Sequence, residues 1–438
     1  MTASSVLRPH ALDNRNFRSL LLLLAGVPIA AVYLWRGLIQ PLLLGTYLGD
    51  LQESYMRGAA RLASGADPYD LCRTVGCTEP TGPQYVMPPL LAWLLQPLVG
   101  LDGHVLAVGV VLVLNAAVAV FLWSTLRALQ VDDFQVAALL VLLVISFEPV
   151  IGNIDEGQIN LILLALSGLW FLGWMSERWW GGIALGAAIA LKVIQAPLVL
   201  LVVWTRRWRM LGAAVATGIL LWLVAEPGYL FEYLSSVLPA VSQGTGLFEN
   251  HSPGGTVTRL FEPDAFLGGV NGSPPPARLI TLLISMAVLV VTLVVSRSSP
   301  RGREGRALQA AAFVAVTPLV ATYSWGTHLV LLLLPISVLC TWSLRRRDWT
   351  VLALVGAGWV LIGPAHKALQ VLLVSGYSDL LVLRLMGEFG VVGLIAIWSA
   401  SLLALKRKRR VAAVALPGLD RHARGEQLPR AIQEAADR

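Results

Sequence analysis

The sequence predicts an all-α protein built from many membrane-spanning helices. Hydrophobic residues make up 56% of its 438 residues and charged residues only 13%, and the mean hydropathy is +0.70, whereas an ordinary soluble domain is about 25% charged. Long apolar stretches alternate with short basic runs along most of the chain. We therefore expect one membrane domain over residues 1–405, followed by a basic, solvated and partly disordered tail over 406–438.

The formal net charge of +7 and the isoelectric point near 9.6 do not indicate nucleic acid as a partner. The arginines and lysines gather in short runs between apolar stretches, which is the pattern that retains loops in the cytoplasm. A nucleic-acid-binding protein would instead concentrate them on one exposed face. Membrane lipids are thus the expected surroundings.

The first apolar segment runs from Phe17 to about Ile39, behind Arg8, Arg15 and Arg18. It lacks a small-residue cleavage site and is longer than a signal-peptide core, so we expect an uncleaved anchor whose N-terminal side faces the cytoplasm. Further apolar segments follow at 86–100, 104–126, 135–152, 158–176, 181–204, 210–226, 278–296, 307–322, 326–344, 350–363 and 386–405.

Segment 181–204 does not have the pattern of a simple crossing. Arg178 precedes it and Arg206 follows it, so both of its ends belong on the cytoplasmic side. Lys192 and Pro197 interrupt its middle. We predict a hairpin of two short helices with Lys192 at its tip, each half reaching only about 18 Å and ending inside a cavity.

The same rule places residues 86–100 on the outside, within an external loop of about 41–103, as a re-entrant or interfacial segment. About twelve helices result, with both ends of the chain in the cytoplasm. The external face then gathers the polar stretches at 50–85, 153–160, 227–276 and 323–328. In the alternative topology, 86–100 crosses fully and 181–204 crosses once, which leaves Arg127 and Arg178 outside.

Two of the three cysteines, Cys72 and Cys77, lie in the external loop on either side of Gly76. In an oxidising compartment they form either a disulfide or two free thiols, and both alternatives remain open. No histidine or further cysteine is spaced to complete a zinc site, so no metal is expected.

Three ionisable residues stand at the edge of an apolar segment or inside one. Asp50 follows the first span, Lys192 lies within 181–204, and His328 begins the run Leu329–Leu334. Ionisable groups at such depth are costly unless they meet a partner or serve a function. We expect Lys192 to meet an anion, either a bound phosphate or the acids at 155 and 156. The alternatives for Asp50 and His328 are a solvated carboxylate and an interfacial histidine.

Short polar motifs follow one another between residues 45 and 345: Asp50-Leu-Gln-Glu-Ser-Tyr55, Gly65-Ala-Asp67-Pro-Tyr69, Tyr85-Val-Met-Pro88-Pro89, Gly157-Gln158-Ile-Asn160, the stretch from Gly182 to Lys192 with Pro197 and Arg206-Arg207-Trp-Arg209, Asn250-His-Ser252 with Thr258-Arg-Leu260, and Ser324-Trp325-Gly-Thr-His328. Together they resemble glycosyltransferase family 87, a group of bacterial enzymes with the membrane fold called GT-C that depend on polyprenyl-phosphate sugars. Glu53 and Met87 depart from the residues usual in the family, which leaves the subgroup and its sugar open.

The resemblance implies an integral glycosyltransferase of the bacterial plasma membrane, with its active site facing outside. It would transfer a sugar, mannose being favoured, from a polyprenyl phosphate to a lipid-linked or polymeric glycan of the cell envelope, with inversion at the anomeric carbon. No cofactor is expected. Arabinofuranose is the alternative sugar. A lipid or solute transporter is the alternative from another class, but the sequence shows no second copy of its interrupted segment, as transporter repeats would.

Sugar transfer to a hydroxyl requires a base for the acceptor proton, and cations or hydrogen-bond donors for the phosphate. The resemblance implies that Asp50 is this base. His328 is the second catalytic candidate, as a phosphate ligand or a proton shuttle. The candidate residues for binding donor or acceptor are Tyr55, Tyr85, Asp155, Glu156, Gln158, Asn160, Lys192, Asn250, His251, Ser252 and Trp325. The acids at 155 and 156 are alternatively residues of an ordinary helix terminus, and Trp325 an interfacial aromatic.

Overall fold

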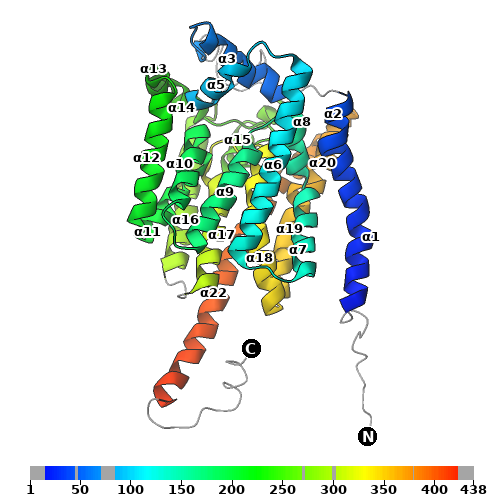
Figure 1. Cartoon of the computed structure of the whole chain (residues 1–438), viewed down its shortest axis with the longest axis vertical. Helices are drawn as coiled ribbons and strands as arrows, with labels where there is room; N and C mark the ends of the chain where they lie inside the picture. The colour runs from blue at the N-terminus through cyan, green and yellow to red at the C-terminus, as the bar shows by residue number, and fades with distance from the viewer. Residues whose placement is uncertain are drawn as a thin grey trace.

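The computed structural model describes residues 15–44, 48–70, 84–268, 272–297, 302–377 and 379–422. All regular structure within these ranges is helical, as the composition predicts. Figure 1 shows a bundle whose longer helices run between a lower and an upper end. These helices are α1 (Arg15–Leu34), α6 (Gly103–Leu129), α7 (Phe134–Ile145), α9 (Asn160–Met175), α12 (Trp208–Val224), α16 (Pro275–Arg297), α17 (Arg303–Val320), α18 (Leu333–Arg346), α19 (Trp349–Ile362) and α22 (Phe389–His422). Helix α10 (Gly181–Leu191) lies among them and is shorter.

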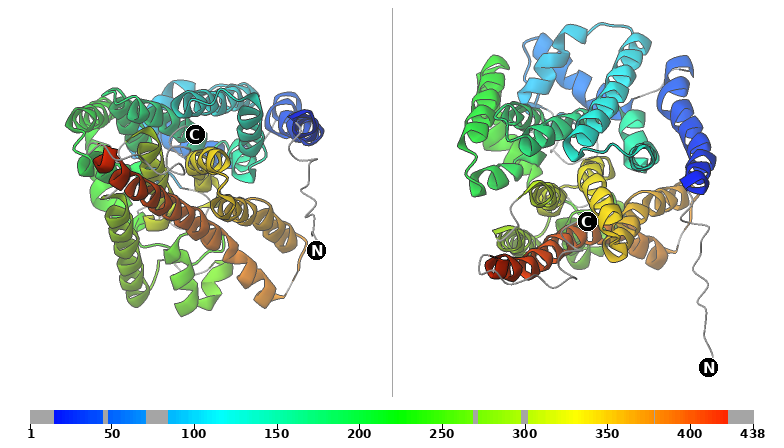
Figure 2. Two further views of the ribbon diagram at one scale, coloured as in Figure 1. Left: turned by 90° about the horizontal axis from the view of Figure 1, so that it is seen from below. Right: turned by 60° about the horizontal axis from the view of Figure 1, so that its bottom comes forward.

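Shorter helices connect the long ones, several of them at the upper end of the bundle (Figure 1). They are α2 (Gln40–Leu44), α3 (Met56–Ala63), α5 (Pro89–Leu95), α8 (Glu148–Glu156), α11 (Leu198–Trp204), α13 (Pro227–Glu232), α14 (Leu238–Val241), α15 (Pro253–Phe261), α20 (Pro364–Val374) and α21 (Leu380–Gly387). Figure 2 shows α1 at the margin of the bundle, where Tyr33 donates a hydrogen bond to Asn115 of α6 at 2.8 Å.

Six helical stretches among the described residues are long and apolar enough to cross a membrane: Leu22–Leu44, Gly103–Leu129, Pro275–Arg297, Gly326–Arg346, Trp349–Val374 and Leu381–Lys408. Two bent pairs, Phe134–Ile145 with Glu148–Glu156 and Trp208–Val224 with Pro227–Val241, raise the number to as many as eight. Backbone groups that are satisfied within helices are what a bilayer requires. The chain is therefore a multi-pass membrane protein. Length and composition thus identify six to eight candidate spans among the described residues, fewer than the roughly twelve helices predicted.

The predicted interruption at Lys192 is present. Helix α10 ends at Leu191, Lys192 is extended, and a 3-10 turn over Val193–Gln195 precedes α11. With 11 and seven residues, the two helices are only about 16 and 10 Å long. Neither is long enough to cross a bilayer by itself.

Contacts between α10 and α12 show that the chain reverses direction between them. A Cβ added at Gly182 would collide with the carbonyl oxygen of Met210, and one added at Gly186 with that of Ala214. Further along, the Trp222 indole donates to the Ala190 carbonyl at 3.1 Å. Successive positions on α10 thus meet successive positions on α12, so the two helices are parallel and α11 runs back between them. This is the predicted hairpin.

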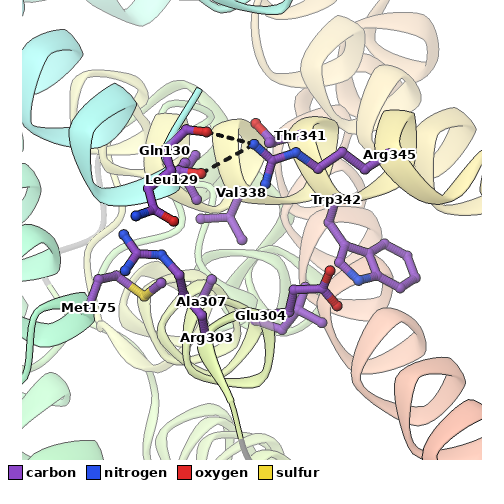
Figure 3. Close-up of a pocket in the computed structure, with 11 residues that line it drawn as sticks. Leu129, Gln130, Met175, Arg303, Glu304, Ala307, Val338, Thr341, Trp342 and Arg345 are labelled. Carbon is purple, nitrogen blue, oxygen red and sulfur yellow. Dashed lines mark hydrogen bonds between the residues drawn. The ribbon is translucent and has the colours of Figure 1, made fainter. Parts of the chain in front are cut away.

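The basic runs gather at one end of the bundle. Arg345 at the end of α18 donates to the carbonyl oxygen of Gln130 at 2.9 Å (Figure 3), and Arg303 at the start of α17 donates to that of Ala128 at 2.7 Å. Each guanidinium thereby satisfies carbonyls that the end of α6 leaves without helical partners.

The turns around α9, α11 and α12 belong to the same end. Arg207 donates to the carbonyl oxygen of Trp174 at 2.6 Å and lies 3.6 Å above its ring, and Glu177 forms an ion pair with Arg306 at 2.6 Å. The neighbouring arginines at 127 and 178 therefore share the side of the other basic runs. This arrangement agrees with the topology that contains the hairpin and not with its alternative.

At the upper end of the bundle, the segments that were predicted to be external loops contain short helices. Within segment 86–100, helix α5 has only seven residues, about 10 Å, so it does not cross. The described part of the stretch 227–276 includes helices α13 to α15, and the chain turns by 116° between α12 and α13. Cys72 and Cys77 lie outside the described residues.

Two helical segments in the C-terminal part are longer than predicted. The apolar segment at 350–363 continues through α20, because Pro364 restarts a helix after Gly363 and needs no amide donor there. Helix α22 continues to His422, past the predicted start of a disordered tail at 406. Lysine, arginine and alanine are strong helix formers, so the basic run extends the helix instead of ending it.

Candidate functional site

Asp50 lies at the upper end of the bundle, where the chain enters the short helical segment that leads into α3. Its carboxylate accepts a hydrogen bond from the side-chain amide of Gln158. The carbonyl oxygen of the same amide accepts a hydrogen bond from the Tyr55 hydroxyl at 2.5 Å. Asp50 and Tyr55, which are five residues apart, therefore hold opposite ends of one amide and fix its orientation.

The turn that carries Gln158 is pressed against this segment. Gly157 has a φ of +67°, and a Cβ at this position would lie 2.8 Å from the Cβ of Leu51 and 2.9 Å from that of Leu48. A glycine is needed here both for the left-handed backbone and for the close approach. Leu48 and Leu51 are themselves buried, so the packing of two leucines brings Gln158 to Asp50.

The polar contacts continue from Gln158 to the tip of the hairpin. The Asn160 amide donates to Gln158 at 3.3 Å and to Asn153 at 3.0 Å. Its oxygen accepts a hydrogen bond from the Lys192 ammonium at 3.0 Å. Asn153, Gln158, Asn160 and Lys192 are all buried. Each link satisfies a polar group that would be costly to bury alone.

Burial raises the pKa of Asp50 above its ordinary value. The positive charge of Lys192 acts in the opposite direction and lowers this pKa, and the negative charge of Glu53 adds to the increase. Lys192 is thus close enough to influence the carboxylate, although the hydrogen bonds between them pass through two amides.

A second contact joins this network to the segment that carries His328. The Asn153 amide donates to the carbonyl oxygen of Thr327 at 2.8 Å. His328 is buried, its Nδ1 has no hydrogen-bond partner within the described ranges, and it lies within the electrostatic range of Lys192. Two cationic or proton-donating groups therefore lie on the side of the network opposite to Asp50.

Further carboxylates lie close to Asp50. A Cβ on Gly49 would be 2.7 Å from a carboxylate oxygen of Glu156, which places Glu156 beside the turn that carries Asp50. Burial raises the pKa of Glu249, and the charges of Glu156 and Asp50 raise it further. Among the described residues, no group of three or more His, Cys, Asp or Glu side chains is arranged to hold a metal ion.

Asp155 does not join the network. Its carboxylate forms an ion pair with Arg36 at 3.0 Å, at the end of the first span. Arg36 also lies 3.7 Å from Glu148, which in turn pairs with Lys367 at 3.2 Å. This half-exposed set of charges links the first span to α8 and α20.

Asn250, His251 and Ser252 are fully buried, and their contacts hold the loop together. The Asn250 oxygen accepts hydrogen bonds from the backbone amides of Ser252 at 3.1 Å and Ser324 at 3.0 Å, and its amide donates to the carbonyl of Thr322 at 3.1 Å. Ser252 caps α15 by accepting from the Gly255 amide at 3.1 Å. These side chains fix the loop to the segment before His328.

His251 packs edge-on against His366, with ring centroids 4.4 Å apart. Neither ring nitrogen of His251 has a hydrogen-bond partner within the described ranges. Burial lowers the pKa of His251 well below its ordinary value, and the charges of His366 and Arg259 lower it further. Both effects favour the neutral form of this imidazole.

The two remaining candidates differ in their surroundings. The Tyr85 hydroxyl donates to the Pro88 carbonyl at 2.5 Å and accepts from the Ala92 amide at 2.9 Å, so it is engaged within its own segment. Trp325 is partly exposed, and its ring lies 5.5 Å from that of Tyr323.

Sequence reasoning did not select Asn153, Glu249 or His366 for the site. Asn153 and Glu249 lie next to selected motifs in the sequence, and this is the one feature that could have indicated their place in the site. His366 follows a segment whose end was placed at 363, so nothing in the pattern connected it with the loop at 250–252.

The fold and the site together define a multi-pass helical membrane protein with a hydrogen-bonded carboxylate at one end of the bundle and a buried lysine behind it. The chain matches the model of glycosyltransferase family 87 over residues 85–321, more than half of its 438 residues. It belongs to glycosyltransferase family 87, which confirms the resemblance.

The chain is similar to the alpha-(1→3)-arabinofuranosyltransferase of Mycobacterium tuberculosis, with 32% identity over 151 residues, and it spans only 35% of that protein's length. It is also similar to the polyprenol-phosphate-mannose-dependent alpha-(1-2)-phosphatidylinositol pentamannoside mannosyltransferase of the same species, with 27% identity over 384 residues and 82% of each chain covered. The corresponding protein of Mycolicibacterium smegmatis is 27% identical over 294 residues, which are 63% of this chain and 68% of that one.

Proposed function

We propose that this glycosyltransferase takes a sugar, preferably mannose, from a polyprenyl monophosphate and adds it to a lipid-linked or polymeric glycan on the outer side of the bacterial plasma membrane. Residues 1–405 form its catalytic domain, of the GT-C type. Two relatives that cover most of this chain are named as polyprenol-phosphate-mannose-dependent mannosyltransferases, which supports both the donor and the lipid-linked acceptor.

In the proposed reaction, the Asp50 carboxylate takes the proton of an acceptor hydroxyl while the hydroxyl oxygen attacks the anomeric carbon. The bond between that carbon and the phosphate oxygen breaks, and its electron pair leaves with polyprenyl phosphate. Attack from the opposite face inverts the configuration, so a β-linked donor gives an α-linked product. Lys192 offsets the charge of the phosphate, and His328 donates a hydrogen bond to it. No step requires a cofactor.

The observation that carries this proposal is the continuous chain of hydrogen bonds from Asp50 through Gln158 and Asn160 to Lys192. It connects the Asp50 carboxylate with a buried cation from a segment far away in the sequence, which supports the proposed roles of the two residues. Such an arrangement suits a reaction in which a proton is removed on one side of the anomeric carbon and a phosphate leaves on the other.

The proposal is tested with purified protein, radiolabelled polyprenyl-phosphate-mannose and an envelope glycolipid fraction as acceptor. We expect transfer by the wild type and a rate about 10²–10⁴-fold lower for Asp50→Asn, because general base catalysis contributes on this order. Glu53→Gln, which changes a carboxylate three residues away, serves as the matched control and should retain most of the activity. Full activity of Asp50→Asn would overturn the assignment of the base.

Arabinofuranose is the second candidate sugar, because the relative with 32% identity is named as an arabinofuranosyltransferase. The same assay with polyprenyl-phosphate-arabinofuranose distinguishes the two. Family membership favours an enzyme over the transporter alternative.

A further inference from the structure

A cleft of about 550 Å³ opens at the basic end of the bundle, away from Asp50. It lies between the turn that joins α9 to α10 and the turn that joins α11 to α12. Helices α11 and α12 are at the left of Figure 1. Its lining residues are Glu177, Arg178, Trp179, Arg206, Arg207, Trp208, Arg209 and Met210.

The charge of the cleft is not neutralised. Its acid, Glu177, is paired with Arg306, and Arg207 is held by Trp174. The other three arginines, at 178, 206 and 209, have no ion pair or side-chain hydrogen bond within the described ranges. Three arginines with unpaired guanidinium groups therefore line one cleft, and guanidinium is the side-chain group best suited to binding phosphate.

The backbone around the cleft offers more hydrogen-bond donors. Residues 208–210 form the first turn of α12, which no side chain caps, so their amides remain free to donate to an anion. Arg206 has a φ of +57°, a conformation that favours glycine. An arginine is nevertheless present there, among the residues that line the cleft.

An apolar surface adjoins the cleft. Trp179 and Trp208 are 55% and 59% exposed, and next to them Ile183 and Trp204 are 43% and 42% exposed. Tryptophan at the edge of an apolar helical surface is typical of the level of lipid headgroups. A free phosphate would not need this surface, whereas a phospholipid would place its acyl chains along it.

We propose that this cleft binds the phosphate headgroup of an anionic phospholipid of the cytoplasmic leaflet, with the acyl chains along α10 and α11. The lipid would join the two turns at the base of the hairpin whose tip is Lys192, and so hold the hairpin in place. Another cavity at this end, drawn in Figure 3, is only about 70 Å³. Its arginines, Arg303 and Arg345, already donate to backbone carbonyls.

The experiment measures lipid binding to the full-length protein in detergent by native mass spectrometry, with phosphatidylglycerol as the anionic probe and phosphatidylcholine as the neutral one. The test variant is Arg178→Gln/Arg206→Gly/Arg209→Gln, in which glycine at 206 suits the left-handed backbone. The control is Arg127→Gln, which removes an exposed arginine at the same end but outside the cleft. Melting temperatures establish that both variants are folded.

We expect the wild type to prefer phosphatidylglycerol, and the triple variant to bind it roughly 100-fold more weakly, at about five-fold per arginine. Arg127→Gln should bind like the wild type. Equal affinity for phosphatidylcholine, or an equal loss in Arg127→Gln, would overturn the proposal. So would full competition by millimolar inorganic phosphate, since this would indicate a site for a free anion. These results do not depend on transfer activity, so they can fail independently of the proposed function.

Discussion

Gln158 connects the residues on which the proposed chemistry depends. It holds Asp50 through its amide nitrogen and Tyr55 through its oxygen, and Asn160 extends the contact to Lys192. Because all these groups except Asp50 are buried, the network is expected to be rigid, and the carboxylate is the part that remains accessible to an acceptor.

The pH dependence of the reaction should report on Asp50. Its pKa is raised by burial, so the carboxylate that acts as base is lost at a higher pH than an exposed aspartate would require. Lys192→Gln removes the charge that lowers this pKa, and should move the acid limb of the profile of log kcat/KM against pH further upward. Lys192→Arg keeps the charge and serves as the control. An acid limb that stays in place in Lys192→Gln would contradict this coupling.

Asn250 is expected to matter for stability through the loop that it holds. Its replacement by alanine leaves buried backbone groups at 252 and 324 without partners, at a cost of about 1–3 kcal/mol. We expect a lower melting temperature in detergent for Asn250→Ala, and little change for Ser235→Ala, which lies on an exposed surface. An unchanged melting temperature combined with a raised KM would instead indicate a direct role in binding.

At the scale of elements, the hairpin of α10 and α11 decides where Lys192 lies. It is held by the close approach of α10 to α12, which glycine at positions 182 and 186 permits. The hairpin ends at the depth where Asn160 begins α9. If residues 181–204 formed one continuous helix across the membrane, Lys192 would not be at a hairpin tip beside Asn160.

Two glycine substitutions test this packing. Gly182→Ala should lower the melting temperature, because its Cβ would collide with the carbonyl oxygen of Met210. Gly212→Ala, in the partner helix, meets nothing within 4 Å and should stabilise by up to about 1 kcal/mol through helix propensity. Thermal unfolding in detergent measures both. Equal changes in melting temperature for the two variants would mean that α10 does not approach α12 as described.

At the scale of the whole molecule, the two ends of the bundle differ in charge. Basic runs that are far apart in the sequence meet at the lower end through hydrogen bonds to helix C-termini and ion pairs. Asp50, Glu156 and Glu249 lie together at the other end. The positive-inside rule predicts that the basic end faces the cytoplasm, and the proposed active site would then face outside.

Reporter fusions test this orientation. Green fluorescent protein fused after Arg127 should fluoresce, because that end is proposed to lie in the cytoplasm, and alkaline phosphatase at the same point should be inactive. Fusions after Asp102, at the upper end of α6, should give the opposite pair of results. An active phosphatase after Arg127 would invert the proposed topology.

The amino-acid sequence by itself determined that the chain is helical and crosses a membrane, because both follow from composition and from the spacing of apolar stretches. It also predicted the interruption at Lys192, since two basic flanks and a buried charge are local features. Asp50, Lys192 and His328 were selected as ionisable groups at the edge of an apolar segment or inside one, and Gln158 and Asn160 as members of a polar motif that resembles one of the family. The structure brings them into one region.

Only the tertiary structure decided which of the selected polar residues face one another. Asp155 and Glu156 are neighbours in the sequence, yet one pairs with Arg36 and the other lies beside Gly49. Asn250 and Tyr85 carry hydrogen-bonding groups like those of Gln158, yet theirs are engaged by backbone groups. The physical reason is that a polar side chain in a membrane protein must be satisfied somewhere, and its partner is set by packing between distant helices.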